Sequence, residues 1–254
     1  MWCLWAAKGG SGCSVVAASA ALRATSNVLL VDLAGGDLST ILGVDDPEVG
    51  LVDWLHQRNP PPDGLTRLEV GVRDRIRLLP FGGRRLEAAL DGQPAGHRCR
   101  AGASHQPGDG SLSTSIELLA RILAFEERPV VIDLGCVAGP TATCPSLSSA
   151  LSPAFLTKAA RSTLVTRLCY LGVRRAMELP PPDDVIVVTE PDRALRPPDV
   201  AKALGVSNVV SIRSDPSVAR AVDAGLLAVR LPRPLRGVPL GQSVKQMSPG
   251  TELR

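Results

Sequence analysis

Aromatic residues, long apolar runs and a basic leader are all missing or scarce in this chain of 254 residues. Phe, Trp and Tyr together make up only 3% of it, so the core must be built mainly from Leu, Val, Ala and Ile. No stretch of about 18 uncharged apolar residues occurs, which argues against a membrane-spanning helix. The first apolar stretch is interrupted at once by Lys8, so we expect no secretory signal.

Paired cysteines and a strong net charge are also lacking. The six cysteines form no CxxC pair, so we expect neither a zinc site nor a disulfide framework, and a reducing cytoplasm fits best. A net charge of +3 is too small to indicate nucleic-acid binding by itself. Lysine is rare beside arginine, which makes Lys8 stand out; the others are Lys158, Lys202 and Lys245.

Short apolar runs alternate with helical patterns along the chain. We predict strands at 2–7, 27–33, 75–80, 129–134, 162–166, 184–189 and 208–212. We predict helices at 15–24, 50–57, 115–125, 198–204 and 218–224. This alternation predicts an α/β fold, a doubly wound and mostly parallel sheet with helices on both faces. We expect a single domain over 1–254, with a mobile loop at 91–113 and an irregular tail from about 232.

A glycine-rich turn joins the first predicted strand to the first helix. Its sequence, Lys8-Gly9-Gly10-Ser11-Gly12-Cys13-Ser14, lets backbone N–H groups converge on an anion at a helix start. Ser14 can offer a hydroxyl to a magnesium ion on the phosphates. Asp32 and Asp133, each following an apolar run, would hold the water shell of that ion at the same sheet edge. The alternative is a turn that carries glycines for tight packing, with aspartates that only cap helices.

The turn resembles the deviant Walker A motif, KGGxGK[ST], of the ParA/MinD ATPases. VLLVD (28–32) resembles the second strand of that family, VVID (130–133) its Walker B strand, and 204–225 its closing segment. The resemblance implies a P-loop NTPase that binds ATP or ADP with Mg²⁺ and forms a nucleotide-dependent homodimer, in which Lys8 contacts phosphate. It implies nucleotide contacts from Lys8, Gly9, Gly10, Ser11, Gly12, Cys13, Ser14, Val15, Thr189 and Asp215, and magnesium contacts from Ser14, Asp32 and Asp133.

Three positions depart from the family pattern. Cys13 replaces the P-loop lysine, and loss of that charge should lower the rate of hydrolysis by a factor on the order of 10²–10³. Ala34 stands where the second switch I acid is usual, although Asp37 could take its place in catalysis together with Lys8. Thr189-Glu190-Pro191 stand where an adenine-reading Asn is usual, which leaves ATP and GTP open. We therefore expect weak or absent hydrolysis.

The motif, with a small residue for the P-loop lysine, is similar to the TadZ/CpaE branch, as is the stretch 193–205; an actinobacterial ParA-like protein is the other resemblance. The branch implies a cytoplasmic protein that positions pilus or secretion machinery in a bacterial cell. The receiver-like domain common in that branch is not expected, because Met1 stands directly before the first strand. Two alternatives remain: an active ATPase of DNA partitioning or division-site selection, and an interaction module that no longer binds nucleotide.

The remaining cysteines and Trp54 are expected to be structural. Cys13 could be a redox switch at a helix start, but a small replacement residue is the favoured interpretation. Cys3, Cys136 and Cys169 lie on or beside apolar runs and should be buried thiols. Trp54 should anchor the core rather than bind a partner.

Basic pairs and the C-terminal stretch bear on partners. The arginine pairs at 84–85 and 174–175 should be solvated helix faces, with non-specific DNA contact left open. The stretch after residue 240 forms no amphipathic helix, so direct membrane insertion is not expected. His56, His97 and His105 show no metal-ligand spacing.

Overall fold

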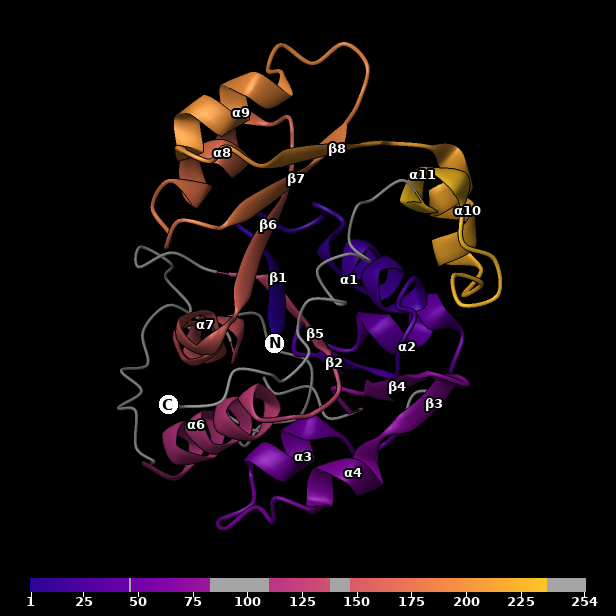
Figure 1. Cartoon of the computed structure of the whole chain (residues 1–254), viewed down its shortest axis with the longest axis vertical. Coiled ribbons are helices and arrows are strands. Elements are labelled where there is room, and N and C mark those ends of the chain that lie inside the picture. Colours follow the sequence, from indigo (N-terminus) through magenta and orange to yellow (C-terminus); the bar gives the residue numbers. More distant parts are fainter. Residues whose placement is uncertain (46, 83–109, 138–146, 237–254) are drawn as a thin grey trace, which may run out of the picture.

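The computed structural model describes residues 1–45, 47–82, 110–137 and 147–236. Its centre is an eight-stranded sheet in the order β3-β4-β2-β5-β1-β6-β7-β8 (Figure 1). All neighbouring strands are parallel except β3 and β4. The strands are β1 (Trp2–Ala6), β2 (Val28–Asp32), β3 (Val70–Arg73), β4 (Ile76–Leu79), β5 (Val130–Cys136), β6 (Arg161–Arg167), β7 (Asp184–Thr189) and β8 (Val209–Arg213).

Helices cover both faces of this sheet. One face carries α1 (Cys13–Leu22), α2 (Asp37–Leu42), α10 (Pro216–Asp223) and α11 (Arg233–Arg236). The other face carries α3 (Leu51–Leu55), α4 (Gly64–Leu68), α6 (Gly110–Ala124), α7 (Leu147–Lys158), α8 (Tyr170–Ala176) and α9 (Pro197–Leu204). The predicted α/β class with a mostly parallel, doubly wound sheet is confirmed.

Alternation along the central strands builds two cores. Trp2 and Leu4 of β1 pack into the cluster under α1, whereas Cys3 and Trp5 pack into the cluster on the opposite face. Successive side chains of a strand point to opposite sides, and both sides are covered, so the strand is apolar throughout. This burial fixes β1 at the centre of the sheet. Lys8 follows β1 at the edge formed by the C-terminal ends of the parallel strands.

The predicted core anchor Trp54 is confirmed, with 1% of its surface exposed and its indole N–H donating to the Pro61 carbonyl at 2.9 Å. Helix α6 starts at Gly110, so the predicted end of the loop at residue 113 is too late; 91–109 lie outside the described residues. The tail contains the short helix α11 before residue 237, beyond which it is not described. None of the described helices is both long and apolar enough to cross a bilayer.

Candidate nucleotide site

The glycine-rich turn leads from β1 into α1 in a conformation that glycine favours. Gly10 has φ +73°, and Gly12, the N-cap of α1, has φ +90°. A Cβ added to either glycine would meet no atom within 4 Å, so the space in front of the turn is open. The Ser11 hydroxyl donates to the Lys8 carbonyl at 2.6 Å and closes the turn. The backbone of these two glycines therefore borders open space and is not packed against other described residues.

The start of α1 has backbone donors with no main-chain partner among the described residues. The first N–H of the helix to find a main-chain partner is that of Val16, which donates to the Gly12 carbonyl at 3.0 Å. The N–H groups of Cys13, Ser14 and Val15 precede it and lack intrahelical acceptors. Together with the positive end of the helix dipole, they form a site that suits a phosphate group.

Cys13 turns inward from the start of α1 toward β5. Only 6% of its surface is exposed, and burial together with the neighbouring Asp133 carboxylate raises the pKa of its thiol well above the ordinary value. The thiol is therefore protonated and neutral at physiological pH. This geometry agrees with the interpretation of Cys13 as a small replacement residue and not with a reactive redox thiol.

Asp133 lies in the interior of β5, fully buried, and not at the end of the strand. Its Oδ1 accepts the Gly135 N–H at 3.0 Å, while Oδ2 has no hydrogen-bond partner among the described residues. Burial raises the pKa of this carboxyl, although the nearby Ser14 hydroxyl and Cys13 thiol work in the opposite direction. An unpartnered buried carboxylate oxygen beside the Ser14 hydroxyl fits a hydrated magnesium ion on bound phosphates.

Asp32 holds the loop that follows β2. Its Oδ1 accepts the N–H groups of Ala34 at 2.9 Å and of Gly35 and Gly36 at 3.3 Å, and its Oδ2 accepts the Leu38 N–H at 3.1 Å. Both oxygens are thus engaged by the backbone. Burial, and then the charge of Asp133, raise the pKa of Asp32 to about 6. These backbone contacts, which include an N–H in the first turn of α2, agree with the alternative in which this aspartate caps the next helix, and its magnesium contact stays a prediction.

Three further residues lie near Asp133. Asp37 is the first residue of α2 and is exposed; burial is the main cause of the raised pKa of Asp133, and the charge of Asp37 adds to it. Ala34 offers only a methyl group, which lies against Gly135. Gly135 has φ +64°, and an added Cβ would lie 2.8 Å from the Ala34 Cβ. The Asp-x-Gly spacing is the signal that could have identified Gly135.

Lys8 is half-buried at the start of the turn. Burial raises the pKa of the nearby Cys136 thiol, and the charges of Arg175 and Lys8 work in the opposite direction. The phosphate contact of Lys8 stays a prediction. The thiols of Cys136 and Cys169 were expected to be buried, and this is wrong: Cys136 is exposed and Cys169 is partly exposed. Both follow apolar strands but stand just past the point where helices cover the sheet. Cys3 is fully buried, as expected.

The predicted base-side residues lie at the ends of two neighbouring strands. The Thr189 hydroxyl, at the end of β7, donates to the Ile212 carbonyl of β8 at 3.3 Å. Asp215 caps α10, where its Oδ1 accepts the Ser217 N–H at 2.7 Å, and this bond lowers the pKa of the carboxyl. Both side chains lie at the sheet edge that carries the turn, and their contacts with nucleotide stay predictions.

The arrangement of strands and helices is similar to that of several solved structures. No protein-family model and no curated protein matches the sequence, whereas solved structures match over nearly its whole length. A ParA family ATPase from Chlorobium tepidum has a TM-score of 0.64 at 17% identity, covering 97% of this chain and 99% of its own. The septum site-determining protein MinD with Mg-ADP from Pyrococcus horikoshii gives 0.64 at 19%, covering 96% and 92%.

A third solved structure is a plasmid partition protein from Borrelia burgdorferi bound to AMPPNP. It gives a TM-score of 0.63 at 13% identity, covering 96% of this chain and 98% of its own. Two of these three structures contain a nucleotide. At such identities the likeness concerns the arrangement of strands and helices. The chain therefore has the fold of the ParA/MinD-type P-loop ATPases.

Proposed function

We propose that this protein binds ATP or ADP with magnesium at the Lys8–Ser14 turn and hydrolyses the nucleotide slowly or not at all. The observation that carries the proposal is the open space around the Cβ positions of Gly10 and Gly12, next to the first N–H groups of α1, which have no main-chain partner among the described residues. Backbone donors at a helix start bind phosphate without any cationic side chain. ParA/MinD-type neighbours with bound Mg-ADP and AMPPNP support this choice of ligand.

The site supplies fewer charges than phosphoryl transfer usually requires. Magnesium would sit between the phosphates and Ser14, with Asp133 accepting hydrogen bonds from its waters, and would neutralise charge on the phosphates. The neutral Cys13 thiol contributes no charge to the transferring group. Lys8 is the basic residue of the turn that can contact phosphate, from its own site or from a partner subunit.

The biological role we propose is positioning of a bacterial assembly such as pilus or secretion machinery, through a nucleotide-dependent homodimer in the cytoplasm. This step rests on the resemblance of the turn to the TadZ/CpaE branch. A dimer that is stable only with nucleotide would give its partners a signal without requiring fast hydrolysis. Non-specific DNA is a further candidate partner, since related partition proteins share this fold.

One observation favours an active ATPase as a second candidate. Asp37 is exposed at the start of α2, near enough for its charge to raise the pKa of Asp133, and its carboxylate would orient a water molecule in place of the acid missing at Ala34. In that case Lys8 and Asp37 are the catalytic pair. Phosphate release with magnesium separates the two: turnover typical of the family, abolished by Lys8→Ala, favours the active enzyme.

Titration calorimetry with Mg-ATP tests nucleotide binding, with Gly12→Ala as the variant and Gly205→Ala as its matched control. Both glycines have positive φ, +90° and +66°, and open space around the Cβ position. Alanine therefore strains the backbone at both sites, by about 1 kcal/mol. We expect Gly12→Ala to weaken binding about tenfold or more and Gly205→Ala to leave it unchanged. If the wild-type protein does not bind nucleotide at millimolar concentration, the remaining alternative is an interaction module that no longer binds nucleotide.

A further inference from the structure

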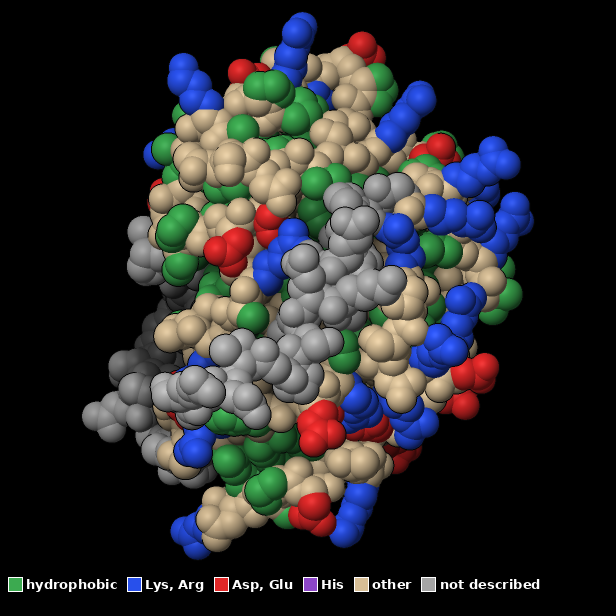
Figure 2. Space-filling view, viewed as in Figure 1, with side chains coloured by type: hydrophobic (Ala, Val, Ile, Leu, Met, Phe, Trp, Pro, Cys, Tyr) green, Lys and Arg blue, Asp and Glu red, His purple; other side chains and the backbone are tan. Residues whose placement is uncertain are grey.

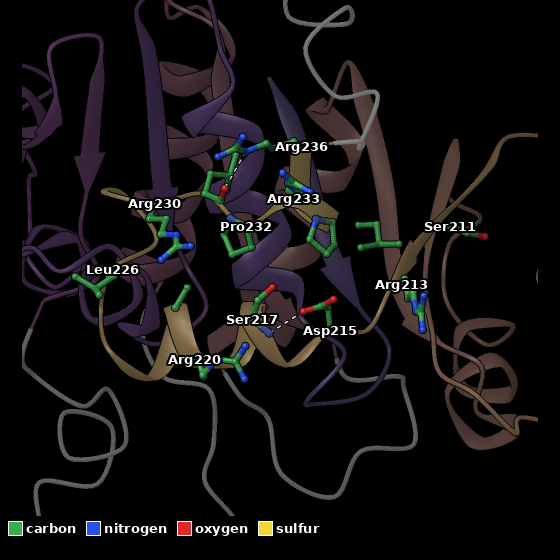
Figure 3. Close-up of a pocket in the computed structure, with 14 residues that line it drawn as sticks. Ser211, Arg213, Asp215, Ser217, Arg220, Leu226, Arg230, Pro232, Arg233 and Arg236 are labelled. Atoms are coloured by element: carbon green, nitrogen blue, oxygen red, sulfur yellow. Dashed lines mark hydrogen bonds between the residues drawn. The ribbon is translucent and has the colours of Figure 1, made fainter.

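A groove of about 1260 Å³ lies between β8, α10 and α11, away from the glycine-rich turn. None of residues 8–15 lines it, and Asp215 at its border is the one residue that it shares with the predicted nucleotide contacts. Five arginines line it: Arg213, Arg220, Arg230, Arg233 and Arg236. Figure 3 shows Arg213 on one side of the hollow and Arg220 and Arg230 on the other.

The positive charge of this groove is not neutralised by the described part of the chain. All five arginines are exposed, and none forms an ion pair with a described residue within 4.0 Å. Some arginines outside the groove are paired, as Arg128 is with Glu69 at 2.6 Å. Figure 2 shows Lys and Arg side chains gathered over the region where Figure 1 places α10 and α11.

The single acid of the groove does not offset these charges. Asp215 is engaged by the Ser217 N–H, and the charges of Arg213 and Arg220 help to lower the pKa of its carboxyl. The described residues that line the groove therefore carry five positive charges and one negative charge, a net charge of +4. Guanidinium groups gathered around one groove repel one another, and a bound anion would relieve that repulsion.

The shape of the groove suits an extended polypeptide. Strand β8 is an edge strand that pairs only with β7 among the described strands, and Ser211, Ile212 and Arg213 of β8 form one wall. An edge strand can accept the backbone of an added segment. Leu226, 47% exposed, adds an apolar contact on another wall. Alternate side chains of an added strand would meet arginine and apolar surface in turn.

The two long segments outside the described residues do not match this charge. Residues 83–109 contain the cations Arg84, Arg85, Arg98 and Arg100 against the acids Glu87, Asp91 and Asp109. Residues 237–254 contain Lys245 and Arg254 against Glu252. A DNA duplex, with phosphates on the outside of a stiff rod, fits a flat or raised basic surface better than a groove. We propose that the groove binds an extended acidic segment of a partner protein.

Fluorescence anisotropy with a labelled peptide tests this proposal. The probe is a peptide of about ten residues in which Glu alternates with Val and Ile; a peptide with Lys in place of Glu and a DNA duplex of about 20 base pairs serve as comparisons. We expect the acidic peptide to bind more tightly than both and to lose affinity with added salt. Arg220→Glu combined with Arg230→Glu should reduce its affinity about tenfold or more.

The matched control is Arg58→Glu combined with Arg121→Glu, which makes the same charge change at exposed positions outside the groove. We expect this variant to bind the peptide within about twofold of the wild type. Arg220→Gln with Arg230→Gln, a milder change, should give an intermediate loss. Equal losses in the groove and control variants, tighter binding of the duplex, or displacement of the peptide by ATP would each overturn the proposal.

Discussion

The Cys13 thiol lies against the Asp133 carboxylate at the start of α1, and both groups are buried. In a P-loop with a lysine at this position, a cation would stand between this acid and the phosphates. Here burial and then the Asp133 carboxylate raise the pKa of the thiol, whereas the thiol works against the burial that raises the pKa of Asp133. The pair explains how the site can keep the shape of a phosphate cradle without the charge that accelerates phosphoryl transfer.

Restoring the missing charge should restore activity. Cys13→Lys places an ammonium group beside Asp133, where it can reach bound phosphates, and we expect ATP hydrolysis to rise by on the order of tenfold to a hundredfold. Phosphate release with magnesium measures the effect. Cys13→Met, a longer side chain without charge, is the control and should stay at the wild-type rate. Equal rates in both variants would show that charge at this position does not limit hydrolysis.

Thiol alkylation should follow the environments of the cysteines. The backbone N–H groups of Gly172 and Leu171 lower the pKa of Cys169, whereas burial raises the pKa of Cys13 and raises that of Cys3 to about 12. Iodoacetamide at neutral pH should therefore modify Cys169 first and leave Cys3 and Cys13 unmodified in the folded protein. Mass spectrometry of peptides measures the order, with the urea-unfolded chain as control. Rapid labelling of Cys13 would instead indicate a redox-active thiol.

Asp32 makes stability depend on pH. The folded protein raises its pKa from 3.8 to about 6, so the folded state holds the proton more tightly than the unfolded chain does. The free energy of unfolding should consequently fall as the pH rises through this window, by about 3 kcal/mol from this residue. Asp32→Asn should remove the contribution of this residue to the pH dependence of the free energy of unfolding. Urea unfolding at several pH values measures it, and an unchanged slope in the variant would contradict the assignment.

Gly135 should not tolerate a side chain. Alanine at this position has φ +64° and a Cβ 2.8 Å from the Ala34 Cβ, so we expect Gly135→Ala to destabilise the protein by roughly 1–3 kcal/mol. Gly205→Ala, with a similar φ and no neighbour within 4 Å, isolates the cost of φ alone. Ala34→Gly in the Gly135→Ala background should recover the steric part. Chemical denaturation compares the four proteins, and equal losses for both alanine variants would exclude the Ala34 contact.

The sequence predicted the parts of the fold whose burial is uniform. The strands β2 and β5 are apolar on both faces because helices cover both sides, and β7 was predicted at its observed bounds. Helix α7 was missed because Pro153 interrupts a segment of Ser, Ala and Leu without helical periodicity. Strand β3 was missed because only alternate residues of it are partly buried.

The site was predictable where it depends on local sequence and not where it depends on contacts across the sheet. The glycines between Lys8 and Ser14 are enough to predict the turn. Asp32 and Asp133 are neighbours because β2 pairs with β5 in parallel register. The four N–H contacts of Asp32 depend on the path of the following loop, which local sequence does not specify. The contact of Gly135 with Ala34 joins strand β5 to the loop after β2, and no periodicity in the sequence indicates it.

The central claim is that main-chain amides at the start of α1 hold the phosphates although Cys13 replaces the P-loop lysine. Amide hydrogen exchange of residues 9–15, measured by NMR with and without Mg-ATP, tests it most directly. The account predicts that exchange of these amides slows about tenfold or more when nucleotide is added at saturating concentration. Nucleotide that binds while the exchange of residues 9–15 stays unchanged would contradict it.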